Sequence, residues 1–532
     1  MLRHTGRYTA ARQPTLAEGW GVEWLTPSSR LYGANGLRTG SDGRIYVAQV
    51  SGSQISALDL QSGEIETISP QGSDIVAPDD VAFDSAGNLF VTEVMDGRVS
   101  MLDTRGHSRV LRDDLPNANG ITVYQDRLFV NECRVGGRLL ELDLNGGEPR
   151  VLAENLVMPN AMEVGPDGML YYPLMGTHEI WRVHPDGGTP EKVTDGLGVP
   201  DAVKFDKAGF IVSTQVGTGD VIRVDPRTGA REVLASVGPG LDNLTFVDGR
   251  LFVSHFTGAI TEIVAGGQTR ETLPGALNWP LDLEVGPAGE LYVADGTYFY
   301  RMTEGGKLQT LGMLMSPGFP GFVRGFVVSA PGEFVVTTAN GQLARYRPEV
   351  PETEILSDGH DQLYGVATTG SGGYVVAETG AGRVLGVKGG QVEVLATGLR
   401  APKGVACTAD GDCLVSESAG GRVARIVRGK VDTVLDGLQC PQGILVKGDS
   451  LFVVDAGAKA VLSVSLKTGD HKVIARDLPI GPPEGVEPKP LRGMEPFSGP
   501  QGPFAGIAAG PDGTLYVAAD GEGSVLALRY QS

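Results

Sequence analysis

Asparagine and aspartate recur at one equivalent position in the first half of this chain, about every forty residues. Their side-chain oxygens are the ligands that a hard divalent cation such as Ca²⁺ or Mg²⁺ prefers. Asn and Asp also cap turns that lead into strands, which is the simpler interpretation of any one of them. Six in succession favour a shared site. The six positions are Asn35, Asp79, Asn119, Asn160, Asp201 and Asp242.

The segments around these positions share one pattern of strands and turns. In DVAFDSAGNLFVTEV (80–94) and DLEVGPAGELYVADG (282–296), two alternating apolar stretches flank a Gly-containing turn, which predicts a β-hairpin. Twelve such repeats of about forty residues, each with four strands, indicate the blades of a β-propeller. We therefore expect an all-β fold of two six-bladed β-propellers with four-stranded antiparallel blades; seven plus five blades is the alternative.

The equivalent positions in the second half of the chain carry different chemistry. They are Leu281, Arg324, Tyr364, Lys403, Gln442 and Ala505. This contrast favours a site in the first half over simple turn capping. Arg324 and Lys403 have the charge to bind an anion, and the alternative is that they are solvated or ion-paired at the rim.

Polar residues also end the second strand of the repeats. In a propeller this end reaches the same mouth as the start of the first strand, so we expect these residues to line a substrate pocket. Asp201, Glu132 and His178 are the candidate catalytic residues, since each can accept a proton. Glu93 and Glu132 can equally bond loop backbone, and His178 can lie in an exposed loop. The predicted pocket residues are Asp79, Glu93, Asn131, Gln215, Asp242 and His255.

The last repeat predicts how the rings close. It ends at SVLALRYQS after three strands, and GVEWLTP (21–27) can supply the fourth, which would remove an open sheet edge. This closure predicts a first propeller formed by 21–240 plus 504–532 and a second formed by 241–477. Residues 478–503, rich in Pro and Gly, would be a connecting segment or lid. The run of Asn and Asp favours the alternative of contiguous propellers, 29–275 and 276–532.

Three of these Asn/Asp motifs resemble the SMP-30/gluconolactonase family of six-bladed propeller lactonases and phosphotriesterases. They are NANGITV at Asn119, MPNAMEV at Asn160 and VPDAVKF at Asp201. The resemblance implies a divalent metal held by these residues and by a Glu that falls at Asn35, in ANGLRTG, where this chain departs from the family. It implies Ca²⁺ first, with Mg²⁺, Mn²⁺ or Zn²⁺ as alternatives. The missing carboxylate predicts weak metal binding or none.

The resemblance implies a metal-dependent hydrolase of a small lactone or related cyclic ester-like substrate, with its site in the central funnel of the first propeller. A lyase or isomerase that uses the same funnel is one alternative. The blade pattern also occurs in streptogramin lyases and in NHL-type propellers, so a non-catalytic binding scaffold is another.

Composition limits the partners of this protein. A net charge of −20 disfavours nucleic acid and anionic membrane surfaces, and no apolar run is long enough to span a bilayer. The four cysteines match no metal motif, which is typical of a cytoplasmic protein with reduced thiols. We expect a small-molecule substrate as the partner; the sequence makes no prediction of oligomeric state.

Overall fold

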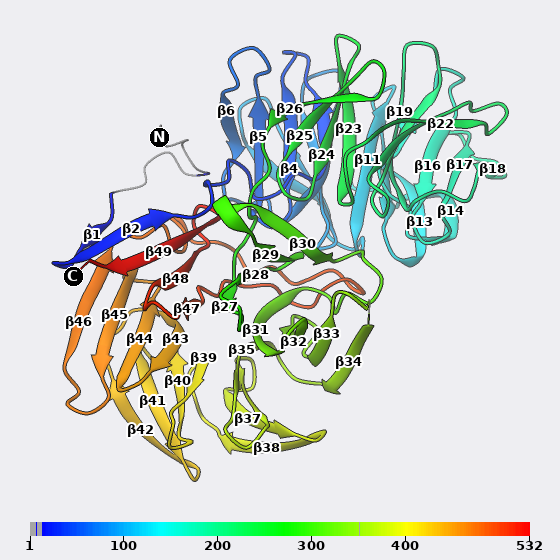
Figure 1. Ribbon diagram of the computed structural model, residues 1–532. Coiled ribbons are helices and arrows are strands. Elements are labelled where there is room, and N and C mark those ends of the chain that lie inside the picture. The colour runs from blue at the N-terminus through cyan, green and yellow to red at the C-terminus, as the bar shows by residue number, and fades with distance from the viewer. Residues whose placement is uncertain (1–6, 8–12, 351, 532) are drawn as a thin grey trace. The chain divides into compact units, whose positions relative to one another are not determined.

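The computed structural model describes residue 7 and residues 13–350 and 352–531 (Figure 1). In this part of the chain, strands β1 to β49 form twelve antiparallel sheets, of which eleven have four strands and one has five. Among the described residues, the one helical element is a single 3₁₀ turn, η1 (Glu304–Gly306). The sheets form two six-bladed β-propellers, which confirms the predicted fold class. None of the described helical structure is long and apolar enough to cross a membrane.

The hairpin turns follow from local sequence. In the second blade, β7 (Pro78–Phe83) and β8 (Leu89–Glu93) are joined by the residues DSAGN. The Asp84 Oδ1 atom accepts the backbone N–H groups of Ala86 and Asn88, at 3.0 and 2.8 Å. Gly87 has a φ of 86°, a left-handed conformation that costs glycine little. The turn is therefore specified by its own residues.

The first strand of each blade is the inner strand, and successive inner strands contact one another around each propeller. In the first propeller the inner strands are β3 (Leu37–Thr39), β7, β11 (Ala118–Tyr124), β15 (Glu163–Val164), β19 (Pro200–Phe205) and β23 (Leu241–Val247). In the second they are β27 (Asp282–Val285), β31 (Val323–Ala330), β35 (Leu363–Thr368), β39 (Pro402–Cys407), β43 (Pro441–Lys447) and β47 (Ile507–Ala509).

The remaining strands complete the blades outward from these inner strands. They are β4–β6 (45–69), β8–β10 (89–112), β12–β14 (127–157), β16–β18 (170–194), β20–β22 (211–236), β24–β26 (250–273), β28–β30 (291–313), β32–β34 (333–357), β36–β38 (374–396), β40–β42 (413–435), β44–β46 (450–476) and β48–β49 (515–530). Apolar side chains fill the space between neighbouring blades. Between the second and third blades, Phe90, Ile121 and Leu128 are at most 1% exposed.

The first ring closes between its first and sixth blades. The inner strand β23 lies against β3, and the Thr39 hydroxyl bonds the Thr245 hydroxyl at 2.8 Å and the Phe246 carbonyl at 2.9 Å. In the second ring, β47 lies against β27, and the Gly506 N–H donates to the Leu281 carbonyl at 2.7 Å. Blades one to six therefore form one propeller, and blades seven to twelve form the other.

This arrangement corrects the predicted register. The division into 21–240 plus 504–532 and 241–477 is wrong, because the sixth blade completes the first ring. The N-terminal strand β2 (Trp20–Trp24) does pair with β49 (Ser524–Tyr530), with Trp24 opposite Leu526, as the sequence predicts (Figure 1). It completes the twelfth blade without carrying that blade into the first ring. A short strand, β1 (Thr15–Leu16), also joins the eleventh blade beside β46 (His471–Arg476).

Two compact units result. One comprises residues 31–275 with 485–496, and the other comprises the described parts of 1–30, 276–484 and 497–532. The boundary after residue 275 matches the contiguous alternative, whereas the N-terminal residues and 485–496 each belong with the other half of the chain. The predicted connecting segment, 478–503, is therefore divided between the units.

Candidate functional site

A bulge in the inner strand accompanies four of the six Asn and Asp positions. On β7, Pro78 pairs with Glu93 and Val81 with Val91, so one extra residue is accommodated on the inner strand. The same register shift occurs on β11, β19 and β23. A bulge of this kind re-aims side chains at the rim of a ring. We call the six positions the Asn/Asp ring: Asn35, Asp79, Asn119, Asn160, Asp201 and Asp242.

The structure brings members of this ring into contact. The Asn35 amide Nδ2 donates to Asp242 Oδ2 at 2.9 Å, and Asn160 Nδ2 donates to Asp201 Oδ2 at 3.2 Å. Asn35 is half-buried, and the other five side chains are buried. Residues from all six blades therefore converge on one mouth of the first propeller.

The three carboxylates of the ring share one electrostatic environment. Burial, and then repulsion from the neighbouring Asp80, raise the pKa of Asp79 to about 7. Burial, then repulsion from Asp242 and Asp79, raises the pKa of Asp201 well above its ordinary value. The pKa of Asp242 is raised in the same way by burial and by Asp79. The mouth is therefore a place where a positive charge would relieve repulsion.

The atoms of this ring fit a hard cation in kind. The Asn119 Oδ1 atom is buried without a hydrogen-bond partner, and amide and carboxylate oxygens are suitable ligands. The amide oxygens of Asn35 and Asn160 instead accept backbone N–H groups, from Val50 at 3.1 Å and from Ala161 at 2.7 Å. Within the described residues, no group of three or more His, Cys, Asp or Glu side chains is placed to hold a metal ion. Amide oxygens would have to complete any coordination shell here.

The side chains at the ends of the second strands brace loops. Gln49, Glu93 and Gln215 each accept a backbone N–H from the loop that leads into the inner strand of their own blade, at 2.8, 2.6 and 2.8 Å. The second propeller repeats this contact at Asp295 and Glu378. Glu93 therefore makes the hydrogen bond to loop backbone that the sequence offered as the alternative to a catalytic base. Its predicted place in a pocket stays a prediction.

The remaining predicted residues lie in separate surroundings. Glu132 is fully buried and ion-paired with Arg138, while Asn131 bonds the backbone of Gly120 and Asn160. His178 is exposed in a turn, with a φ of 59°. Burial lowers the pKa of His255 to about 4, and its ring bonds the Pro239 carbonyl at 2.9 Å. The catalytic assignments of Glu132 and His178 stay predictions.

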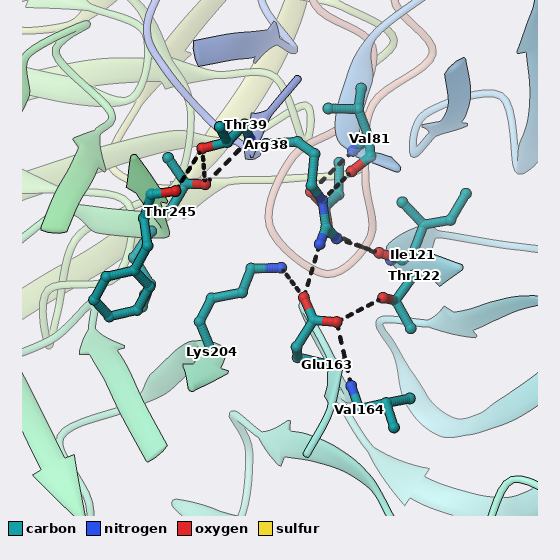
Figure 2. Close-up of polar contacts among 12 residues, drawn as sticks. Arg38, Thr39, Val81, Ile121, Thr122, Glu163, Val164, Lys204 and Thr245 are labelled. Atoms are coloured by element: carbon teal, nitrogen blue, oxygen red, sulfur yellow. Dashed lines mark hydrogen bonds and ion pairs between the residues drawn. The ribbon is translucent and has the colours of Figure 1, made fainter. Parts of the chain in front are cut away.

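A layer of charged side chains lies three residues beyond the Asn/Asp ring and was missed in the sequence (Figure 2). Arg38 Nη1 and Lys204 Nζ both contact Glu163 Oε2, at 2.7 and 3.0 Å. Arg38 also donates to the carbonyls of Val81 and Ile121, so it reaches from the first blade to the second, third and fourth. We call Arg38, Glu163 and Lys204 the ionic layer. Opposite charges at the same offset in three repeats were the available signal.

The ionic layer is held together by its own electrostatics. Burial by itself would raise the pKa of Glu163, but Lys204 and Arg38 outweigh it and lower that pKa to about 2. Thr122 Oγ1 and the Val164 N–H donate to the other carboxylate oxygen, at 3.2 and 3.3 Å. A charged, hydrogen-bonded layer therefore crosses the channel below the ring.

Part of the predicted connecting segment borders the mouth that carries the Asn/Asp ring. Lys489 Nζ lies 3.3 Å from Asp74, and the Asn117 amide donates to the Glu495 carbonyl at 2.8 Å. Asp74 and Asn117 belong to loops that lead into β7 and β11. Residues 485–496 therefore lie beside the second and third blades at this mouth.

The corresponding mouth of the second propeller is covered. Arg324 is fully buried, and it donates to the carbonyls of Leu363 and Pro500. Lys403 donates to the Pro503 carbonyl, and both cations lie over the Tyr364 ring, at 4.3 and 4.5 Å from its centroid. The segment after residue 497 thus occupies the position that stays lined with Asn and Asp in the first propeller.

A family model described as SMP-30/Gluconolactonase/LRE-like region matches residues 14–254. No curated protein matches the chain significantly. A gluconolactonase from Xanthomonas campestris is 16% identical, with 46% of this chain and 92% of that chain covered and a TM-score of 0.38. A chain from a nidogen/laminin complex is 26% identical, with 38% and 79% covered and a TM-score of 0.35.

Proposed function

We propose, on the premise that residues 14–254 form an SMP-30/gluconolactonase/LRE-like region, that the first propeller hydrolyses a small lactone or related cyclic ester. The observation that carries the proposal is the convergence of six Asn and Asp side chains at one mouth, with three buried carboxylates of raised pKa among them. The second propeller, with a covered mouth and no such ring, is a contrast within the same chain.

Each residue of the mouth has a role in this proposal. Asp201 accepts the proton of the attacking water, since burial and neighbouring carboxylates raise its pKa and make it a stronger base. Asn35, Asn119, Asn160 and Asp201 would hold a divalent cation, with the amide oxygens of Asn35 and Asn160 released from the backbone N–H groups that they otherwise accept. When bound, such a cation would polarise the substrate carbonyl and lower the pKa of water. The ionic layer closes the channel beneath the substrate.

The first experiment is elemental analysis of purified protein after equilibration with Ca²⁺, Mg²⁺, Mn²⁺ or Zn²⁺. We expect about one equivalent of metal, lost in Asp201→Asn. Asp206→Asn is the matched control, because Asp206 lies in the hairpin turn of the same blade and is ion-paired with Arg223. Metal retained in Asp201→Asn, or lost equally in Asp206→Asn, would refute the assignment.

A gain-of-binding variant tests the missing carboxylate. Asn35→Glu restores the family carboxylate, and we expect roughly tenfold tighter cation binding, equivalent to about 1.4 kcal/mol. Turnover of lactones is then followed by product mass. Hydrolysis adds one water, whereas a lyase or isomerase adds none, and a binding scaffold gives no product.

We also propose a reducing, cytoplasmic location, supported by four free cysteines.

A further inference from the structure

A cavity of about 180 Å³ lies along the inner strands of the second propeller. It is smaller than the pockets that usually hold drug-sized molecules, so an occupant would be small. Its wall is mostly glycine and small aliphatic side chains. The charged side chains in the wall are Asp282 and Glu284.

The two acids differ in how they are satisfied. Asp282 accepts the backbone N–H groups of Leu283 and Phe326, both at 3.0 Å. No hydrogen bond or ion pair is found for the Glu284 carboxyl among the described residues. Burial alone raises the pKa of Glu284 to about 7. Glu284 is half-buried, and a carboxylate withdrawn from bulk water without a protein partner makes it the exception in this channel.

In the first propeller, a glutamate at the equivalent position is paired with cations. Glu284 lies opposite Tyr292 on the neighbouring strand, just as Glu163 lies opposite Tyr171. At this level of the first channel, Arg38 and Lys204 bond Glu163. The corresponding positions of the second channel, each three residues after a position equivalent to the Asn/Asp ring, are Val327, Ala367, Ala406, Leu445 and Ala508. None of these side chains carries a positive charge. The space that Arg38 and Lys204 fill in the first channel is therefore open in the second, where it forms the cavity.

We propose that the second propeller binds a small organic monocation, a primary ammonium or guanidinium group on a short alkyl chain. The cationic group would bond Glu284, as Arg38 and Lys204 bond Glu163. The alkyl part would lie against the aliphatic wall. A hard metal ion is a poor match, because Ca²⁺ takes six to eight oxygen ligands and Mg²⁺ an octahedral set. Only one unengaged carboxylate faces this cavity.

Titration calorimetry of the full-length protein tests the proposal, with methylguanidinium and propylammonium chlorides as probes. Measurements at pH 8 and constant ionic strength keep Glu284 ionised. We expect saturable binding that weakens tenfold or more in Glu284→Gln. Glu290→Gln is the matched control, since Glu290 lies on the same hairpin and bonds the Tyr292 hydroxyl. It should bind like the unaltered protein.

A second variant separates the cavity from the charge. Ala406→Leu keeps Glu284 and fills space in the cavity wall, so it should also lose binding. The uncharged analogues methylurea and propanol should not bind. The proposal would be overturned if Glu284→Gln bound the probes as tightly as the unaltered protein, or if neither cation bound saturably. It would also be overturned if the uncharged analogues, or K⁺, bound as tightly as the organic cations.

Discussion

Glu163→Gln is predicted to destabilise the first propeller by about 3–5 kcal/mol at pH 7, the usual cost of removing one partner from a buried ion pair. The substitution keeps the shape of the side chain but removes the one anion that Arg38 and Lys204 both contact, and leaves them only the more distant charge of Asp80. Their side chains are only 16% and 6% exposed, so water cannot replace the lost charge. The pKa of Glu163, lowered to about 2 by Lys204 and Arg38 against the effect of burial, agrees in sign with this loss.

The pH dependence has a definite sign. The folded-state pKa of Glu163 is lowered, so its contribution is fully present above pH 4.5 and is lost as pH falls toward 2. Glu163→Gln lacks this titration. The stability difference between the two proteins should therefore be constant from pH 7 to 5 and shrink below pH 4.5.

Glu262→Gln is a matched control in the same propeller. The pKa of Glu262 is also lowered to about 2, chiefly by hydrogen bonds from Arg250. The side chains of its partners Arg250 and Arg270 are 43% and 62% exposed, so both are solvated when the carboxylate is removed. We expect a loss of at most about 1 kcal/mol, as for surface pairs.

Urea unfolding followed by tryptophan emission measures these effects. Of the four tryptophans, Trp181 lies in the first propeller. Replacing Trp20, Trp24 and Trp279 by Phe makes emission report on that propeller alone. If Glu262→Gln costs as much as Glu163→Gln, or if Glu163→Gln costs less than about 1 kcal/mol, the reasoning from partner burial is wrong.

Two further predictions concern other parts of the chain. A protein that begins at residue 29 lacks β2 and exposes the edge of β49. The thermal midpoint of the second propeller should therefore fall, while Trp181 emission reports an unchanged first propeller. An unchanged midpoint would contradict the closure role of β2. Cys133 and Cys413 are buried, and burial raises the pKa of both thiols. Both should therefore resist Ellman's reagent at pH 8 until the protein is unfolded. Rapid reaction of either thiol in the folded protein would contradict their burial.

The sequence could predict the candidate site only in part. Asn35, Asp79, Asn119, Asn160, Asp201 and Asp242 recur at one position of a regular repeat, so their convergence follows from the blade pattern. The roles of Glu93 and Gln215 do not follow, because a polar residue at a strand end can face a pocket or bond a loop. Their backbone partners, Val76 and Gly198, are distant enough in sequence that only the folded loop reveals the contact.

The blades and their number were determined by the sequence alone, since hairpins depend on local turns such as that at Asp84 and on local alternation of apolar residues. The sequence also predicted which strand completes the last blade, because an unpaired sheet edge requires a partner strand. Which blades share a ring was decided by tertiary structure. Every blade presents similar apolar faces to its neighbours, so only the packing of β23 against β3, and of β47 against β27, closes the two rings. The ionic layer belongs to the same category, because Arg38, Glu163 and Lys204 meet only across a closed channel.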